Sequence, residues 1–226
     1  MTLKTVKVPK NLEPLFQEAE SFISDHFKSF KMRPETGQIF VGEDRYILVR
    51  AESLSVKFFE FLMNLYPTMD NAEAQESCAK VLFDLGRSIG VSDGQCCHDK
   101  TNSTDPLARL STGPIHFAHT GWSFVEILEE SSPTQDDDML LLYNHPQTFE
   151  SDSWIKTGTK TSFCTCHMNA GYSSGWVSEA FNIDLKSVEI LCRSKGDSTC
   201  RFIMARPHKL EERILDYKMK NPDLFK

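Results

Sequence analysis

The sequence has no long apolar segment and no excess of positive charge. None of its hydrophobic runs approaches the ~20 residues that a membrane-spanning helix requires. Its first residues, MTLKTVKVPKNLEP, are basic but lack the apolar core of a secretory signal, so we expect a cytoplasmic protein without a membrane span. The net charge of −7, from 25 basic and 32 acidic residues, argues against direct binding to nucleic acid, which requires a basic face.

The sequence also lacks the motifs of several large enzyme classes. It contains no nucleophile elbow, no P-loop and no dinucleotide-binding fingerprint, and Gly113 and Gly121 do not have the spacing of a phosphate-binding loop. The acidic run at residues 136–138 has the oxygen chemistry of a calcium site but neither its spacing nor its glycine. These absences favour a binding function over a catalytic one.

What the sequence does contain is a composition typical of a folded, cysteine-rich intracellular domain. Hydrophobic residues make up 40% of the chain, which includes 16 phenylalanines, and this composition indicates a globular protein. A length of 226 residues is sufficient for one large domain or at most two small ones. In a reducing compartment, the seven cysteines are better explained as metal ligands or buried thiols than as disulfides.

Hydrophobic periodicity, together with the positions of proline and glycine, predicts a mixed α+β domain. Helices are expected at residues 11–30, 54–66, from 72 onwards, from 105 onwards, at 166–181 and at 208–219. Strands are expected at residues 38–41, 45–50, 122–128, 139–143, 187–192 and 200–205, the first two forming a hairpin. The polar stretch at 90–102 is predicted to be a loop. We expect an antiparallel sheet with helices packed beside it.

Two glycines mark the helix predicted at residues 166–181. Gly171 and Gly175 lie one turn apart, and each lowers the intrinsic stability of a helix by roughly 1 kcal/mol relative to alanine. Glycines at this spacing allow another backbone or a ligand to approach closely.

The stretch that follows contains an arrangement of possible metal ligands. Cys192 and Cys200 enclose a polar loop, and Glu189 precedes Cys192 by three residues within a predicted strand. Residues three apart in a strand point to opposite faces, so a bulge or a strand end is needed before both can reach one ion. With Cys166, at the start of the preceding helix, these residues offer three sulfurs and a carboxylate. Such a set suits a closed, structural zinc site.

The spacing of these cysteines leaves other interpretations open. It is not one of the paired CxxC patterns of common zinc sites, and free cysteines are often simply buried. A disulfide between Cys192 and Cys200 is a further alternative, which the lack of a secretion signal disfavours.

The run LCRSKGDSTCRF, preceded by Glu189 and by CHMNAGYSSGW, resembles the C-terminal half of the 4-vinyl-reductase domain. That domain is also the effector-sensing domain of the XylR/DmpR class of aromatic-catabolism activators. The resemblance implies a structural zinc ion held by Cys166, Glu189, Cys192 and Cys200. It extends upstream through DPLARLSTGPIHFAHTGW. It implies a ligand-binding fold of the NO-signalling/Golgi-transport type at residues 35–206, after an N-terminal helical segment at 1–34 and before a C-terminal helix at 207–226.

A ligand pocket is expected among aromatic and histidine side chains that offer an apolar box with a few polar groups. Each of these residues could equally belong to an ordinary core. The candidates are His116, Phe117, Trp122, Tyr143, His145, Tyr172 and Trp176.

The resemblance also indicates where this chain departs from its relatives. In the aromatic-sensing relatives, a histidine and a tryptophan bind the ligand hydroxyl. Here the histidine position falls at or next to Phe117, with His116 as its neighbour, and the tryptophan position falls at or near His145. This departure puts recognition of phenol in doubt but keeps a pocket in the same place.

Three functions follow as hypotheses. The first is a non-enzymatic, zinc-stabilised domain that senses a small hydrophobic ligand and signals through homodimerisation or a partner protein, as the sensor relatives do. The second is a reductase, because the family is named after an enzyme that reduces a tetrapyrrole vinyl group, although no cofactor motif supports it. The third is an assembly module, because vesicle-tethering subunits share this fold and bury an acyl chain; a tunnel reached from Cys78 or Cys97 would favour it.

Overall fold

The computed structural model describes residues 3–225, which are built around a five-stranded sheet with the strand order β1-β5-β6-β8-β7. β1 runs parallel to β5, whereas the other neighbouring strands are antiparallel. The α+β class is therefore confirmed, but the sheet is mixed instead of wholly antiparallel. The strands are β1 (Val6–Lys7), β5 (Val125–Ile127), β6 (Leu140–His145), β7 (Lys186–Leu191) and β8 (Cys200–Ala205).

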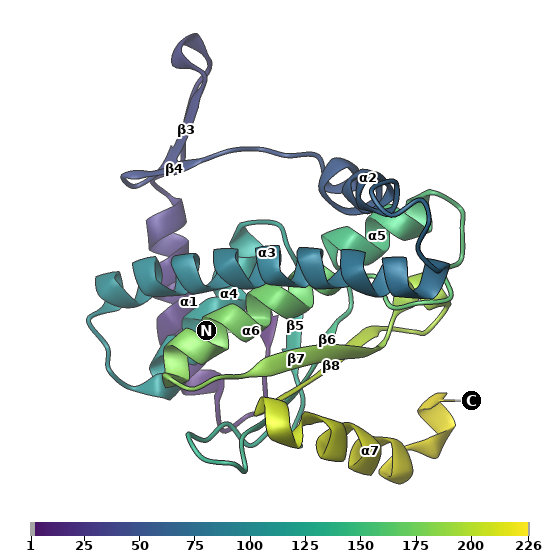
Figure 1. Cartoon of the computed structure of the whole chain (residues 1–226). Helices are drawn as coiled ribbons and strands as arrows, with labels where there is room; N and C mark the ends of the chain where they lie inside the picture. Colours follow the sequence, from purple (N-terminus) through teal and green to yellow (C-terminus); the bar gives the residue numbers. More distant parts are fainter. Residues whose placement is uncertain (1–2, 226) are drawn as a thin grey trace.

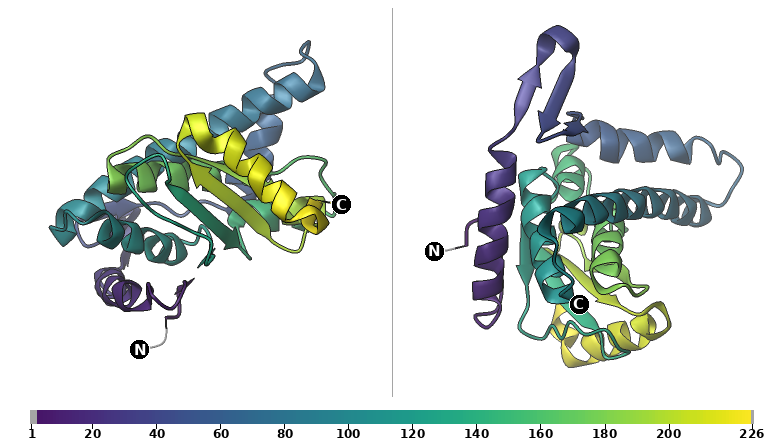
Figure 2. Two further views of the ribbon diagram at one scale, coloured as in Figure 1. Left: turned by 90° about the horizontal axis from the view of Figure 1, so that it is seen from below. Right: turned by 90° about the vertical axis from the view of Figure 1, so that its left-hand side faces the viewer.

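Helices cover both faces of this sheet in layers (Figures 1 and 2). α4 and α6 lie on one face, with α1 and α3 packed outside them, and α7 lies on the other face. The helices are α1 (Glu13–Phe27), α2 (Phe58–Met63), α3 (Asn71–Thr101), α4 (Pro106–His119), α5 (Phe149–Lys156), α6 (His167–Phe181) and α7 (Leu210–Lys220). Short 3-10 helices span Pro34–Thr36, Arg193–Lys195, Pro207–Lys209 and Pro222–Phe225. Between residues 3 and 225, no helix is both long and apolar enough to cross a bilayer.

Alternate side chains of β8 pack into two separate hydrophobic cores, one on each face of the sheet. Phe202 and Met204 face the core beneath α4 and α6, whereas Ile203 and Ala205 face the smaller core beneath α7. This is the two-residue period of a strand that is buried on both faces. Apart from Arg201 this strand is apolar, which is why the sequence predicted its bounds correctly.

α3 and α6 are in direct backbone contact where their glycines meet. A methyl group added at Gly90 would overlap the carbonyl oxygen of Tyr172, and one at Gly171 would overlap the carbonyl oxygen of Phe83. The close approach predicted from the glycine spacing of α6 is therefore confirmed, and its partner is another helix. Gly86 and Gly175 make equivalent approaches along the same crossing.

The loop predicted at residues 90–102 is wrong, because α3 continues without a break to Thr101. Gly90 packs against α6, and Cys97 and His98 are buried, so the polar residues between them form only the solvent face of a helix. Tertiary packing overrides the weak helix propensity of this stretch. The helix ends at Asn102, whose positive φ of 52° is a helix-terminating conformation that asparagine tolerates. α5 was not predicted at all.

Residues 31–46 form an arm that projects from the body (Figure 2). Its base contacts the body, because Asp44 pairs with Lys100 of α3 and Tyr46 contacts His116 of α4. The arm is a three-stranded antiparallel sheet of β2 (Lys31–Arg33), β3 (Gln38–Val41) and β4 (Asp44–Tyr46). The predicted hairpin is confirmed and gains a third strand, but its second strand ends at residue 46 and not at residue 50. Residues 47–52, which we call the strap, connect the arm to a π-helical turn at Ser53–Lys57 that leads into α2. The strap leaves Ile47 75% and Leu48 73% exposed.

Candidate metal centre and binding cavity

The four predicted metal ligands converge at one end of the sheet. Cys166 immediately precedes α6, Glu189 lies in β7, Cys192 follows β7 and Cys200 begins β8. Their ligand atoms all lie within 4.8 Å of one another. The Sγ–Sγ distances are 3.6 Å between Cys166 and Cys200 and 4.0 Å between Cys192 and Cys200. Two sulfurs bound to one tetrahedral zinc at about 2.3 Å would be about 3.8 Å apart, so these distances suit zinc.

A β-bulge brings Glu189 to the same side as the cysteines. The pairing of β7 with β8 shifts register between Glu189 and Leu191. The extra residue turns the end of the strand, so Glu189 and Cys192 can face one point although they are three residues apart. The irregularity that the sequence required is therefore present.

The chemistry of the cluster fits a cation. Oε2 of Glu189 accepts a hydrogen bond from the Cys166 N–H at 2.9 Å, but Oε1 is shielded from solvent and has no hydrogen-bond partner within residues 3–225. Burial raises the pKa of Glu189 well above its usual range, because an unpaired carboxylate is unfavourable there. A bound cation would satisfy Oε1 and compensate the charge of the thiolates.

Backbone groups around the cluster are arranged to stabilise thiolates. The Arg193 N–H donates to Sγ of Cys200 at 3.4 Å, and the Thr165 N–H donates to Sγ of Cys192 at 3.5 Å. Metal-bound sulfurs commonly receive such outer hydrogen bonds, which orient the ligands. These residues could hold zinc with no open coordination position.

Two further groups beside the cluster were not predicted. The thiol of Cys164 lies beside that of Cys192 without belonging to the set of four. Glu150, on α5, is fully buried and accepts hydrogen bonds from the N–H groups of Met168 and Asn169 at the start of α6. Burial raises the pKa of Glu150 to about 7. Neither residue has a sequence signal, because α5 itself was not predicted and Cys164 falls outside the motif.

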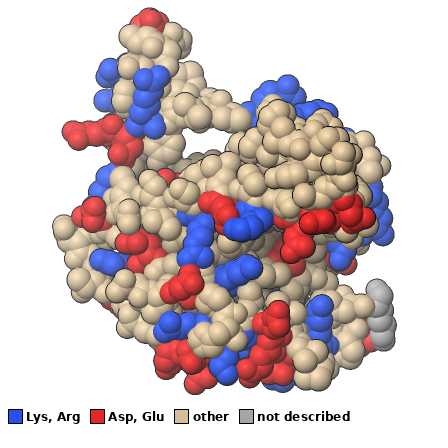
Figure 3. Space-filling view, in the orientation of Figure 1, with Lys and Arg blue, Asp and Glu red and all other residues tan. Residues whose placement is uncertain are grey.

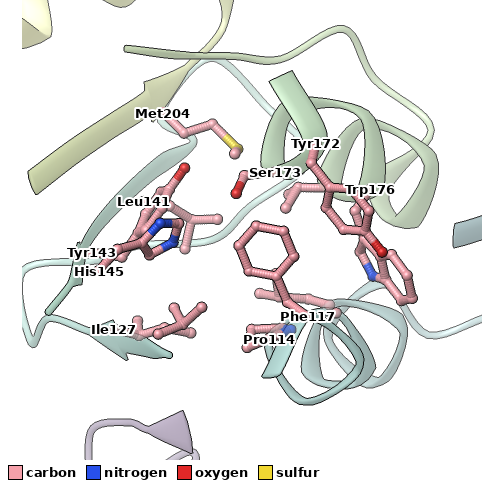
Figure 4. A pocket seen from close by; sticks show the side chains of 14 residues that line it. Pro114, Phe117, Ile127, Leu141, Tyr143, His145, Tyr172, Ser173, Trp176 and Met204 are labelled. Atoms are coloured by element: carbon pink, nitrogen blue, oxygen red, sulfur yellow. The ribbon is translucent and has the colours of Figure 1, made fainter. Parts of the chain in front are cut away.

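A small apolar cavity lies between the sheet and the helices α4 and α6 (Figure 4). Five of the predicted ligand-binding residues line it: Phe117, Tyr143, His145, Tyr172 and Trp176. Ile127, Leu141 and Met204 from the sheet, and Leu110 and Pro114 from α4, complete much of the wall. These aliphatic residues gave no signal in the sequence beyond ordinary core periodicity.

His145 is a polar side chain in the cavity wall whose ring nitrogens lack hydrogen-bond partners among the described residues. It is fully buried. Burial lowers its pKa to about 3, so the ring is neutral and offers one donor and one acceptor. The hydroxyl of Tyr143, by contrast, is hydrogen-bonded to Ser187 Oγ at 2.6 Å, and Trp176 Nε1 donates to the Arg109 carbonyl at 3.3 Å.

The two remaining candidates, His116 and Trp122, line a different space. They border a cleft of about 650 Å³ that lies beneath the strap and against α3. The space-filling view shows the body hollowed beneath this connection (Figure 3). His116 is nevertheless linked to the cavity wall, because its Nδ1 lies 3.0 Å from the hydroxyl of Tyr172.

The cavity is smaller than an aromatic ligand. Its volume is about 40 Å³, whereas a buried cavity that binds benzene has about 150 Å³. The ring of Phe117 extends into the space between His145 and Tyr172 (Figure 4). Its centroid lies 5.5 Å from that of His145 and 4.7 Å from that of Tyr172. A ring-shaped ligand can therefore enter only if a lining side chain moves, and Phe117 is the one whose ring extends into this space.

Comparison with known proteins supports the architecture. No protein-family model matches this sequence, and neither does any curated protein sequence. The crystal structure of the phenol-responsive sensory domain of the transcription activator PoxR, determined with phenol, superimposes with a TM-score of 0.69 and 18% identity. The match covers 92% of this chain and 97% of that one. This chain has the fold of that sensory domain. The predicted resemblance to the effector-sensing domain of XylR/DmpR-class activators is thus confirmed at the level of the fold.

A second solved structure is more distant. It is a trafficking protein particle complex subunit 3 from Naegleria fowleri, covalently bound to palmitic acid. Its TM-score is 0.48 at 11% identity, and the match covers 69% of this chain and 93% of that one. A similarity of this extent carries no functional argument.

Proposed function

We propose that this protein is a sensory domain that binds a small, neutral, ring-shaped ligand in the cavity between the sheet and α4/α6. The observation that carries the proposal is His145, a fully buried imidazole with two unpartnered nitrogens in an otherwise apolar wall. Buried polar groups are normally hydrogen-bonded, and an exception that faces a cavity indicates that a ligand completes the bond.

The cavity wall defines the class of ligand. No lysine, arginine, aspartate or glutamate occurs among the described residues that line it, so a charged ligand would lose its hydration without compensation. Neutral His145 can donate to a carbonyl or hydroxyl oxygen, or accept from a hydroxyl proton. A phenol-like molecule satisfies these conditions, whereas a carboxylate such as benzoate does not.

We further propose that Cys166, Glu189, Cys192 and Cys200 bind zinc and that this zinc is structural. Four protein ligands complete a tetrahedral shell and exclude the open position that a catalytic zinc needs. The ion would fasten the β7–β8 connection to the start of α6. Because Cys200 is paired with His145 in the sheet, the metal centre would also hold the polar end of the cavity in place.

Replacing His145 with leucine should weaken phenol binding by about ten-fold, which is the loss expected for one buried hydrogen bond of about 1.4 kcal/mol. Benzene, which cannot form that bond, should bind the variant at least as tightly as the wild type. Isothermal titration calorimetry with phenol, benzene and benzoate measures both effects. Tyr143→Phe is the matched control, because the hydroxyl of Tyr143 is already bonded to Ser187.

The outcomes of this titration are distinct. An equal loss of phenol and benzene affinity in His145→Leu would indicate a steric effect and refute the anchoring role of His145. If the wild-type protein binds none of the three compounds, the cavity is not a site for such ligands and the proposed function is wrong.

We also propose that a second copy of the chain covers the arm and the strap. Three short strands need a hydrophobic face or a packing partner for stability, and most of the arm stands clear of its own body, which it contacts at Asp44 and Tyr46 (Figure 1). Consecutive exposed apolar residues in the strap, Ile47, Leu48 and Val49, continue the same surface. A self-complementary patch of this kind, shared by two identical subunits around a two-fold axis, is the commonest way to cover such a surface.

Replacing Leu48 with lysine should therefore shift the protein from dimer to monomer, because it places a charge in the middle of the apolar patch. Sedimentation velocity at several protein concentrations measures the distribution. Leu215→Lys is the control, since Leu215 is also exposed but lies on α7, on the opposite face of the sheet. A wild-type protein that remains monomeric at high concentration would contradict this proposal.

A further inference from the structure

Two neighbouring residues in the last turn of α4 face two different parts of the molecule. Phe117 extends into the cavity, between His145 and Tyr172 (Figure 4). His116 borders the cleft beneath the strap and contacts the arm, because its Nε2 lies 3.5 Å from the hydroxyl of Tyr46 in β4. A movement of this one turn would therefore change both the cavity and the attachment of the arm.

The hydrogen bonds around His116 form a directed chain. Tyr172 donates its only hydroxyl proton to Oδ2 of Asp93 at 2.9 Å. Its oxygen must then accept from Nδ1–H of His116 at 3.0 Å, which leaves Nε2 of the neutral ring to accept from Tyr46. Burial lowers the pKa of His116 to about 3, so the ring is neutral and can supply one donor and one acceptor. The chain links the cavity wall to the arm.

The walls of the cavity differ in their freedom to move. Tyr172 and Trp176 belong to α6, whose backbone is fixed against α3 at the glycine crossing. α4 contains Pro114, which has no N–H to donate to the carbonyl of Leu110, so this helix lacks one backbone hydrogen bond just before its last turn. Phe117 lies on this less constrained wall, and its ring takes up the space between His145 and Tyr172 that a ligand ring would need.

We propose that the last turn of α4 couples occupancy of the cavity to the attachment of the arm. A ligand that displaces Phe117 moves His116 with it and weakens the Tyr172–His116–Tyr46 chain, which loosens β4 at Tyr46, while the ion pair of Asp44 with Lys100 still holds the other end of the strand. This inference rests on the proposed ligand-binding function. It adds the structural signal that follows binding, because the arm becomes more mobile when the cavity is filled. The arm is also the surface on which we expect the second copy to dock.

Hydrogen–deuterium exchange of the full chain, read in peptides that cover residues 38–46, tests the coupling. Tyr172→Phe and Tyr46→Phe each break the chain, so each should accelerate exchange in the arm about five-fold without ligand, as for loss of one buried hydrogen bond. The double variant should be no faster than either single variant, because both remove the same connection. Tyr143→Phe, which removes a cavity hydroxyl with no link to the arm, should exchange at the wild-type rate.

Addition of phenol provides the second part of the test. In the wild type, saturating phenol should accelerate exchange in residues 38–46, and in Tyr46→Phe it should add little to an already fast rate. If phenol binds by calorimetry but arm exchange does not change, the coupling is refuted while the proposed function survives. If phenol does not bind, the proposed function fails. The comparison of variants without ligand still tests the hydrogen-bond chain from Tyr172 to Tyr46, because a wild-type exchange rate in Tyr172→Phe would show that this chain does not hold the arm.

Discussion

Replacing Cys200 with serine should abolish zinc binding and lower the midpoint of thermal unfolding by about 10–20 °C. Structural zinc in small domains contributes about 10 kcal/mol or more of apparent binding free energy. If only about 5 kcal/mol of that is lost here, a domain of this size shifts by 2–4 °C for each kcal/mol. The effect is large because the variant leaves Cys166, Glu189 and Cys192 buried without their cation. Metal analysis of protein purified without added metal, combined with thermal unfolding, measures both quantities.

Cys164→Ser is the matched control for this substitution. Cys164 is the thiol beside Cys192 that does not belong to the set of four. This variant should keep one zinc per chain and unfold close to the wild-type temperature. Well-folded wild-type protein without zinc would show that the cluster consists of buried thiols. Loss of zinc in Cys164→Ser, with retention in Cys200→Ser, would show that the ligand set is different.

Replacing Gly90 with alanine should destabilise the protein by about 3 kcal/mol or more, at the upper end of the range for overpacked sites. The added methyl group overlaps the carbonyl oxygen of Tyr172, and a backbone carbonyl cannot rotate away as a side chain can. The two helices must separate, which also disturbs the wall of the cavity. Chemical denaturation with urea measures the change in free energy of unfolding.

Gly94 provides a control in the same helix, one turn further on. A methyl group there would meet the side chain of Glu179 at ordinary contact distances of 3.5 and 3.6 Å. Gly94→Ala should therefore be neutral or stabilise the protein by up to about 1 kcal/mol through better helix propensity. Equal stability of Gly90→Ala and Gly94→Ala would contradict the close crossing of α3 and α6.

The Gly90 and Gly94 substitutions also show that the sequence pattern does not tell which glycine is in close backbone contact. Gly90 and Gly94 look alike in the sequence, and their polar surroundings predicted a loop. Only the position of α6 distinguishes them, because one glycine faces a backbone and the other faces a flexible side chain. The same packing explains why the helix persists through a stretch of low helix propensity.

The candidate cavity was predicted only in part. Aromatic residues in the right segments indicated five of its lining residues, since large aromatic side chains in a globular chain are mostly buried. His116 and Phe117 could not be separated in this way, although one faces the cleft and the other the cavity. Which way each points depends on the rotation of α4 about its axis, and many distant contacts set that rotation.

The sequence by itself determined the class of the fold, most of its helices and strands, and the four residues of the candidate metal centre. These features depend on local periodicity and on chemically distinctive side chains, which remain visible in a linear pattern. Only the tertiary structure decided that Glu189 turns towards the cysteines at a bulge and that the unsatisfied histidine of the cavity is His145. It also decided that Tyr172 joins the cavity to the arm. The physical reason is that hydrogen-bond satisfaction and close packing depend on groups far apart in the sequence, which only the folded chain brings together. Tyr46 and His116 are 70 residues apart, and His116 and Tyr172 are 56 residues apart.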